Sequence, residues 1–282
     1  MQAEQFKKIT QSLISLPTLP TVAAQLFELS GSEREQREAL EQIVSSDPVL
    51  TARLLKMSNA KGENVTGIHS AVSKLGLEQA KDLCMEVSMS RTFELKNSKV
   101  DLQKFWDHFC AVGTVARIVA QKYEPRLATD AFTAGLMHDI GKIILLQYRG
   151  VEFEQAIVFS KSRPCELYLA EKEHFGMDHG QAGALFAESW RIPRSICEVM
   201  QYHHDLARAQ IARPLVTLVA FADILCRILG AGDGGNYAPP SFTAELANEL
   251  GKWNIDLELN ALQPLMLTCI EELNKRNLTQ YG

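Results

Sequence analysis

Apolar residues recur at helical spacing along almost the whole 282-residue chain, and no segment shows a convincing alternation of apolar and polar residues. Spacings of three and four residues place side chains on one face of an α-helix, whereas a half-buried strand requires a period of two. Stripes of this kind include Phe6, Ile9, Leu13 and Leu16, then Val22, Leu26 and Leu29, then Ala80, Leu83, Cys84 and Val87. The pattern predicts an all-α fold.

Two short motifs predict where helices begin. Ser32 and Glu35 have the spacing of a capping box, in which each side chain accepts a hydrogen bond from the other residue's backbone N–H. Asp47 precedes Pro48, which combines a capping carboxylate with a proline in the first helical turn. We therefore expect one helix to start after Ser32 and another after Asp47.

A polar stretch, LKNSKVD, interrupts the helical pattern between the two parts of the chain. We interpret it as the boundary between an N-terminal helical lobe, residues 1–98, and a second lobe with a C-terminal helical tail, residues 99–282. The glycine-rich segment GAGDGGNYAPP, residues 230–240, follows no strand and is therefore a poor phosphate-binding loop. We interpret this segment as a linker.

Composition and charge exclude several classes of function. The sequence is 46% hydrophobic and 22% charged, as in soluble globular proteins, and its net charge of -5 comes without clustered Lys and Arg, which argues against a broad nucleic-acid-binding surface. The N-terminus lacks the apolar run of a signal peptide, and the run LVTLVAFADILCRILG is too short to span a bilayer. We expect a cytoplasmic protein that binds neither nucleic acid nor membranes, with its six scattered cysteines reduced.

Polar residues on apolar helical faces mark a candidate site in the second lobe. His108 shares a face with three valines, and the pair His138-Asp139 stands between two apolar runs in GLMHDIGK. Asp223 lies in a helix that is apolar nearly all round, where a carboxylate is strongly disfavoured unless it is paired or binds a metal. Two carboxylates would repel each other unless a cation joined them. The pattern indicates a site for divalent iron, manganese or zinc between three helices.

Each residue taken alone has a simpler interpretation. A lone His108 is more often a core or capping histidine, and a lone Asp223 can accept hydrogen bonds in a structural network. We assign no function to His69 and interpret His174 as a loop or capping residue. His179 is a better ligand candidate, because it starts a predicted helix whose apolar face it shares. The joint occurrence of these residues favours the metal site.

The stretch HDIGK, with His108 before it and Asp223 after it, resembles the HD superfamily of metal-dependent phosphohydrolases. Longer segments resemble the HDOD family, the HD-related output domains of bacterial signalling: LPTLPTVAAQLFEL, IVSSDPVLTARLLKMSNA, IHSAVSKLGL, FWDHFC and FGMDHGQAGALFAESWRIPRSICEVMQYHH. The resemblance runs from about Leu16 to about Leu229. It implies an all-α protein in which an N-terminal helical lobe packs on an HD-type helical bundle.

The resemblance also implies a set of metal ligands. In the related HD-GYP phosphodiesterases, His and Asp residues hold two or more metals. Carried across by motif, the ligands here are His108, His138, Asp139, His179, His203, His204 and Asp223. Asp139 would bridge two divalent metals, for which iron or manganese is favoured over zinc, magnesium or nickel. The sequence departs from HD-GYP after His203-His204, where HHDLARAQIARPLV replaces the glycine-rich GYP loop, and this argues against hydrolysis of cyclic di-GMP.

Two functions remain open. HDOD proteins are regarded as regulatory modules without established catalysis, so the resemblance favours a signal-transduction protein that binds signalling protein partners or a nucleotide. The alternative is a metal-dependent phosphohydrolase, acting on phosphodiesters or nucleotides, in which metals generate hydroxide and Asp139 and Lys142 are the candidate catalytic residues. Lys142 lies one turn from His138 and can meet a phosphate oxygen, although a salt bridge or a surface position fits this lysine equally well.

Overall fold

The computed structural model describes residues 20–90, 100–232 and 234–278, and in these ranges every regular element is a helix. The predicted all-α fold is confirmed. The expected stripe from Phe6 to Leu16 and the expected lobe boundary at residues 98 and 99 lie outside the described residues.

The helices are α2 (Pro20–Phe27), α3 (Glu33–Ser45), α4 (Pro48–Ser58), α5 (Ile68–Leu75), α6 (Leu77–Ser90), α7 (Leu102–Tyr123), α8 (Ala128–Met137), α9 (Ile140–Tyr148), α10 (Gly150–Ser162), α11 (Leu167–Phe175), α12 (His179–Ser189), α13 (Arg194–Tyr202), α14 (Arg213–Ile228), α15 (Ala244–Gly251) and α16 (Leu259–Lys275), with short 3-10 turns η1 (Pro125–Leu127) and η2 (Leu206–Arg208).

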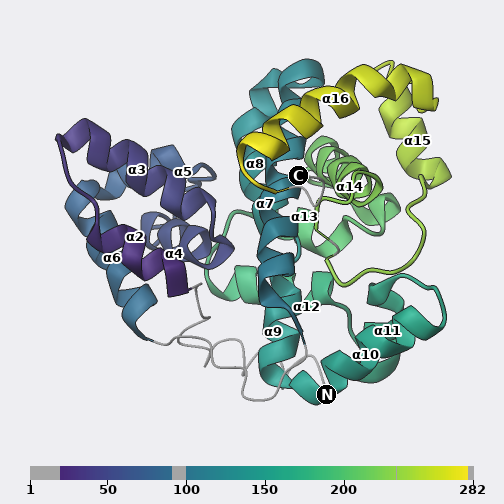
Figure 1. The fold of residues 1–282 in the computed structure, drawn as a ribbon, viewed down its shortest axis with the longest axis horizontal. Coiled ribbons are helices and arrows are strands. Elements are labelled where there is room, and N and C mark those ends of the chain that lie inside the picture. The colour runs from purple at the N-terminus through teal and green to yellow at the C-terminus, as the bar shows by residue number, and fades with distance from the viewer. Residues whose placement is uncertain (1–19, 91–99, 233, 279–282) are drawn as a thin grey trace.

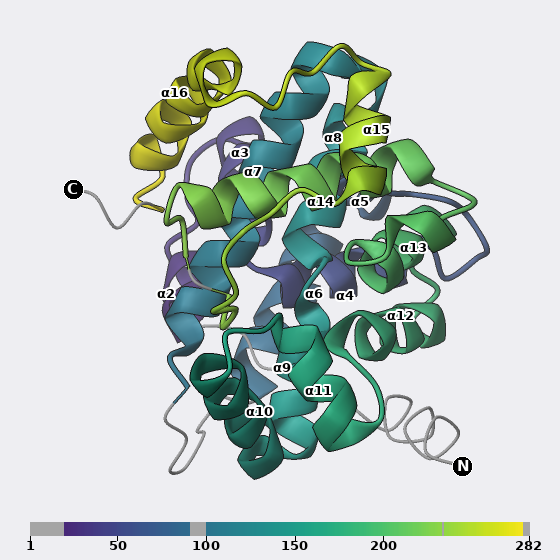
Figure 2. The ribbon, with the colours of Figure 1, turned by 90° about the vertical axis from the view of Figure 1, so that its right-hand side faces the viewer.

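The helices form two groups. Figure 1 shows α2 to α6 gathered on one side of the long helix α7, with the later helices around α7 and on its other side. Turning the molecule by 90° shows α14 lying across α7, with which it packs (Figure 2). The second group therefore has α7, α8 and α14 at its centre. His108 lies in α7 and Asp223 in α14, and the His138-Asp139 pair directly follows α8.

Both predicted helix starts in the first group are confirmed. Ser32 caps α3 through a capping box, in which its own N–H donates to the carboxylate of Glu35 at 2.8 Å. Asp47 caps α4 by accepting hydrogen bonds from the N–H groups of Val49 and Leu50 at 2.8 and 3.1 Å. These bonds satisfy N–H groups that have no partner within the first helical turn.

Close backbone contacts between helices set the positions of the candidate ligands. A methyl group added at Gly135 of α8 would lie 2.9 Å from the Cα of Gly113 in α7, so the two backbones touch where these helices cross. A methyl group added at Gly141 of α9 would lie 1.8 Å from the carbonyl oxygen of His179 in α12. Gly141 is thus a packing glycine, and its missing side chain lets α12 approach near enough for His179 to reach Asp139.

The first group of helices packs on the second, as the resemblance implies. Arg53 and Lys56 of α4 each lie 4.4 Å from the centroid of the Trp190 ring, which follows α12. The guanidinium of Arg191 donates to the carbonyl oxygen of Ala60 at 2.8 Å. A continuous buried apolar core also runs through both groups. The end of α12 opposite His179 is therefore in contact with α4 and with the turn that follows α4.

The structure bears on two expectations from composition, one for the cysteines and one for membrane-spanning segments. All six cysteines are free thiols, and burial raises the pKa of Cys84 and Cys197 to about 12, which keeps these thiols protonated. In the described ranges, no helix has both the length and the hydrophobicity that crossing a bilayer requires.

Candidate metal centre

Seven side chains singled out in the sequence lie together in the second group of helices. His108 belongs to α7, the His138-Asp139 pair joins α8 to α9, and Asp223 belongs to α14. His179 is the first residue of α12, and the other two histidines follow α13 directly. Their ligand atoms fall into two sets, within each of which all atoms are no more than 4.8 Å apart. We call Asp139, His179, His203 and His204 the outer group, and His108, His138 and Asp223 the inner group.

The carboxylate of Asp139 lies between the two groups. Its Oδ1 is 2.9 Å from Nε2 of His179 and 3.5 Å from Nε2 of His203. Its Oδ2 is 3.2 Å from Nε2 of His138 and 3.7 Å from Nε2 of His108. Asp139 occupies the N-cap position of α9 but makes no capping hydrogen bond, so both oxygens are directed to the cluster. One oxygen facing each group is the arrangement of a carboxylate that could bridge two cations.

The histidines of the outer group are oriented by acceptors behind them. Nδ1 of His179 is 2.6 Å from the buried carboxylate of Glu171, and Nδ1 of His203 is 2.9 Å from the carbonyl oxygen of Met200. Because these acceptors hold the proton on Nδ1, Nε2 is directed to the cluster, as in histidines that bind metals. The Nε2 atom of His179 is 3.4 Å from that of His203 and 3.1 Å from that of His204. Two atoms bound at about 2.1 Å to one tetrahedral metal lie about 3.4 Å apart.

The inner group contains ligand atoms without hydrogen-bond partners. Nδ1 of His138 is bonded to the carbonyl oxygen of Gly135 at 2.6 Å, while its Nε2 makes no hydrogen bond. Nδ1 of His108 is also buried without a hydrogen bond, and Nε2 of His108 lies 3.1 Å from Oδ1 of Asp223. Buried polar atoms almost always have partners, and imidazole nitrogens and carboxylate oxygens around one point suit a divalent metal. The residues present therefore fit the metal that the resemblance implies.

The charges in the cluster favour the protonation states that bind metals. Burial alone would raise the pKa of both Asp139 and Asp223, but the histidines and cationic side chains around them outweigh burial and hold each pKa well below its usual range. Burial lowers the pKa of His138, and burial together with the adjacent His203 lowers that of His204. Ionised carboxylates and neutral imidazoles are the forms that bind a metal.

His179 titrates differently from its neighbours. Burial lowers its pKa, but the carboxylates of Glu171 and Asp139 on either side outweigh burial and raise the pKa overall. Without a metal, these two carboxylates favour a ring that is protonated on both nitrogens, with Nε2 facing Asp139. A metal bound at this nitrogen would displace that proton, while the hydrogen bond to Glu171 would keep the ring oriented.

Lys142 lies inside the protein, with its side chain only 3% exposed. Its Nζ is 2.5 Å from Oδ2 of Asp139 and donates to the carbonyl oxygen of Gly234 at 2.8 Å. A surface position for Lys142 is therefore wrong, and the salt bridge considered from the sequence is present. The contact of this ammonium group with a phosphate oxygen stays a prediction.

The glycine-rich segment covers the inner group. A methyl group added at Gly232 would lie 2.7 Å from the backbone nitrogen of His108, and one added at Gly234 would lie 2.8 Å from the His108 ring. Both glycines have a positive φ, +72° and +53°, which side chains rarely tolerate. The interpretation of this segment as a linker was incomplete, because it also forms one wall of the candidate site.

Two histidines lie outside the cluster, and one carboxylate that supports the cluster was not predicted from the sequence. His69 pairs with Glu41 at 2.9 Å in the first group of helices, and His174 bonds the carbonyl oxygen of Ala170 at 2.8 Å within α11, so neither joins the cluster. Glu171, which orients His179, was not predicted. It lies one turn from the buried Leu167 and Phe175, and a carboxylate on an apolar helical face was the signal that could have identified it.

Comparisons with known proteins agree with this architecture. The family model of the HDOD domain matches residues 16–206. The MmoQ response regulator of Methylococcus capsulatus is 20% identical, with 89% of this chain and 98% of that chain covered and a TM-score of 0.67. A virulence factor of Campylobacter jejuni is also 20% identical, with 96% of each chain covered and a TM-score of 0.69. Likeness at these identities shows the fold alone.

A relative among curated proteins is longer than this chain. An uncharacterized protein of Treponema pallidum (strain Nichols) is 22% identical over 227 residues, which are 78% of this chain and 44% of that protein. The chain thus spans less than half the length of this curated relative.

Proposed function

The chain belongs to the HDOD domain family, and from this premise we propose that it is a regulatory protein of bacterial signal transduction. In this proposal its HD-type site holds a divalent metal, and the protein acts in the cytoplasm by binding a signalling protein partner or a nucleotide. The match to the family covers every residue of the cluster except Asp223. We retain the division into lobes at residues 98 and 99 as part of the proposal, with the N-terminal lobe as the surface for a partner.

The enclosure of the inner group is the observation that carries the regulatory function. None of His108, His138 and Asp223 is more than 6% exposed, and the glycine-rich segment lies directly against His108. A phosphodiesterase must bring the scissile phosphate into line with a metal-bound nucleophile. An extended substrate such as a cyclic dinucleotide would have to displace this segment to reach the inner group. The enclosure thus favours a sensing or structural role over rapid turnover.

Different residues of the chain would bind the metals, orient the ligands and balance their charge. The outer and inner groups would each bind one ion, with Asp139 between them, and we favour iron or manganese over zinc, magnesium or nickel. Glu171 keeps Nε2 of His179 directed at the cluster, and the carbonyl oxygen of Gly135 does the same for His138. Lys142 neutralises part of the charge of Asp139. When bound, a divalent metal would supply a Lewis acid and a hydroxide at neutral pH.

A metal-dependent phosphohydrolase remains the second candidate, because all seven implied ligands are present in two compact groups. The two functions are separated by assaying the protein loaded with iron or manganese against bis(4-nitrophenyl) phosphate, cyclic dinucleotides and nucleotides. The regulatory function predicts slow turnover or none. We expect the double substitution His138→Ala with Asp139→Ala to empty the site, while His69→Ala, at an exposed histidine outside the cluster, serves as the matched control. Fast turnover that is lost only in the double variant would establish the phosphohydrolase instead.

A further inference from the structure

The metal centre reaches the surface at one of its seven side chains. His204 is partly exposed, whereas the other six are buried. His204 lines a pocket of about 330 Å³ that is bounded by α11, α12, the end of α13 and the segment after His204. A small molecule that approaches the outer group through this pocket therefore meets His204.

Two cationic side chains, Lys172 and Arg208, line this pocket beside the carboxylates of Asp178 and Asp205, and the two cations differ in their partners. Nζ of Lys172 lies 3.0 Å from the carboxylate of Asp178, so its charge is already balanced. The guanidinium of Arg208 lies 5.3 Å from the centroid of the Tyr202 ring, and no carboxylate of the described residues is within 4.0 Å of it. Arg208 is therefore the cation of the pocket that is available to an anion.

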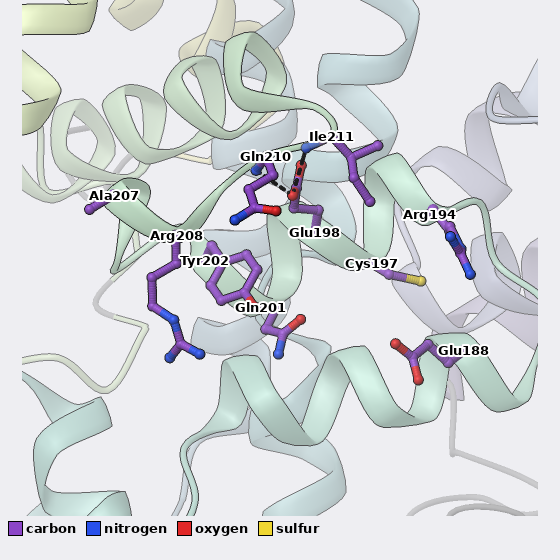
Figure 3. A pocket seen from close by; sticks show the side chains of 10 residues that line it. All are labelled: Glu188, Arg194, Cys197, Glu198, Gln201, Tyr202, Ala207, Arg208, Gln210 and Ile211. Carbon is purple, nitrogen blue, oxygen red and sulfur yellow. Dashed lines mark hydrogen bonds between the residues drawn. The ribbon is translucent and has the colours of Figure 1, made fainter.

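A buried carboxylate fixes the segment that follows Arg208. Glu198 accepts hydrogen bonds from the backbone N–H groups of Gln210 at 2.6 Å and of Ile211 at 2.8 Å (Figure 3). It also accepts one from the backbone N–H of Ala212. The N–H of Arg208 itself donates to the carbonyl oxygen of Asp205 in the turn η2. The backbone that carries Arg208 is thus held on both sides, so a ligand has to order only the side chain of Arg208 and not the segment that carries it.

The adjoining pocket does not reach the candidate metal centre. This second pocket, of about 490 Å³ and drawn in Figure 3, shares Arg208 and Tyr202 with the first but is also lined by the carboxylates of Glu188 and Glu198. Its thiol, Cys197, has a pKa raised to about 12 by burial and by Glu188, so it is not a reactive nucleophile. Each pocket is lined by two carboxylates, Glu188 and Glu198 here and Asp178 and Asp205 beside His204, but only the pocket at His204 also meets a residue of the outer group.

We propose that the pocket at His204 binds a small molecule through a terminal phosphate group, and that Arg208 recognises this phosphate. The inference rests on the proposed function, because a metal held by the outer group would be the second positive charge facing the pocket. A guanidinium presents paired N–H donors that match two phosphate oxygens. The volume of about 330 Å³ is near the lower end for small-molecule sites, which suits a phosphomonoester or inorganic phosphate better than a cyclic dinucleotide.

The proposal is tested by titration calorimetry on the full chain loaded with Mn²⁺, with inorganic phosphate, adenosine monophosphate and adenosine as the probes. We expect inorganic phosphate and adenosine monophosphate to bind and adenosine not to bind. Arg208→Ala should lower the affinity for inorganic phosphate and for adenosine monophosphate by about 10- to 100-fold, which is the range for hydrogen bonds to charged groups. Arg208→Lys should recover part of this loss, because it keeps the charge without the paired donors. The matched control is Arg163→Ala, since Arg163 is also exposed and lies 4.7 Å from an aromatic ring, Phe159, but lines neither pocket.

Metal content measured on the same samples separates this inference from the proposed function. Arg208→Ala should hold as much metal as the wild type, because Arg208 is not a ligand. Binding that is equal in the wild type and Arg208→Ala, or adenosine binding as tightly as adenosine monophosphate, would overturn the phosphate site even if the metal is present. Phosphate binding that depends on Arg208 in a wild type unable to hold metal would support the phosphate site and remove the metal from the proposed function.

Discussion

The outer and inner groups are built from the same residue types but differ in how their side chains are held and covered. In the outer group, acceptors fix the rings of His179 and His203 from behind, and His204 opens to a pocket. In the inner group, His138 is fixed in the same way, but Nδ1 of His108 has no hydrogen-bond partner and the glycine-rich segment covers its ring. Ligand identity alone thus does not define a metal site, because orientation and access are set by neighbouring residues.

This difference implies an order of filling. An oriented ring loses little rotamer freedom when it binds, and an open route lets a hydrated ion enter. We expect the first equivalent of metal to enter the outer group and the second to enter the inner group.

Asp139→Ala should remove both sites, because Asp139 directs one carboxylate oxygen to each group. We expect metal affinity to fall by more than about 100-fold. Removing a residue that only hydrogen-bonds to a metal ligand lowers affinity by about 10- to 100-fold, and removing the shared ligand itself should cost more. Competition titration with a metal-sensitive dye gives the affinity and the number of ions bound. If Asp139→Ala still binds one ion with the affinity of the wild type, one group binds metal without Asp139. That result would contradict the role of Asp139 as a bridge.

Asp223→Ala should affect the inner group alone. Asp223 lies 3.1 Å from His108 and is not among the ligand atoms of the outer group. We expect the number of bound ions to fall by about one while the tighter site keeps its affinity, as for two sites with one shared ligand. Asp82→Ala, at an exposed aspartate in α6, is the control for loss of a carboxylate. Equal weakening of both sites would contradict the division into two groups.

Glu171→Gln should weaken the outer group without removing a ligand. The amide cannot supply the charge that Glu171 places 2.6 Å from Nδ1 of His179, so affinity for the first ion should fall by about 10- to 100-fold. Glu173→Gln is the matched control, because Glu173 lies on the same helix and is exposed. If the two variants bind metal equally well, Glu171 is a structural carboxylate that does not act on the site.

Gly232→Ala should change stability more than metal binding at the outer group. It adds a methyl group 2.7 Å from the backbone of His108 at a φ of +72°. Gly62→Ala is a control with the same strain and no clash, since its φ is +85° and nothing lies within 4 Å. Each kcal/mol lost should lower the melting temperature by about 2–4 °C, and the shift for Gly232→Ala should be at least about twice that for Gly62→Ala. Equal shifts in calorimetric scans would show that the segment does not press on His108.

Local sequence signals were sufficient to predict much of the fold and of the cluster. The capping side chains of Ser32 and Asp47 act on N–H groups a few residues away, so their effect can be recognised from spacing alone. His108 and Asp223 were identified because a polar side chain on an apolar helical face must find a partner in the core. The His138-Asp139 pair and His179 were singled out from their apolar surroundings, and the resemblance supplied His203 and His204 as ligands.

Features that depend on tertiary packing could not be predicted in this way. The contact between Gly232 and His108 joins positions far apart in the chain, and a glycine-rich segment has no periodicity that points to its neighbours. Arg208 likewise lies in a stretch, HHDLARAQIARPLV, that was noted only for replacing the GYP loop, and the hydrogen bonds to this stretch from Glu198 in α13 are a tertiary feature. The need for glycine at position 141 likewise depends on the position of α12, whose backbone at His179 leaves no room for a side chain there.

The central claim is that the seven-residue cluster is a metal centre, and its most direct test is elemental analysis of the purified protein. The protein should be prepared at low oxygen, without chelators and without a nickel column, beside the double variant His138→Ala with Asp139→Ala. We expect about two equivalents of divalent metal per chain in the wild type, mainly iron or manganese, and close to none in the double variant. A wild type that contains no metal and takes up neither Fe²⁺ nor Mn²⁺ would contradict the claim.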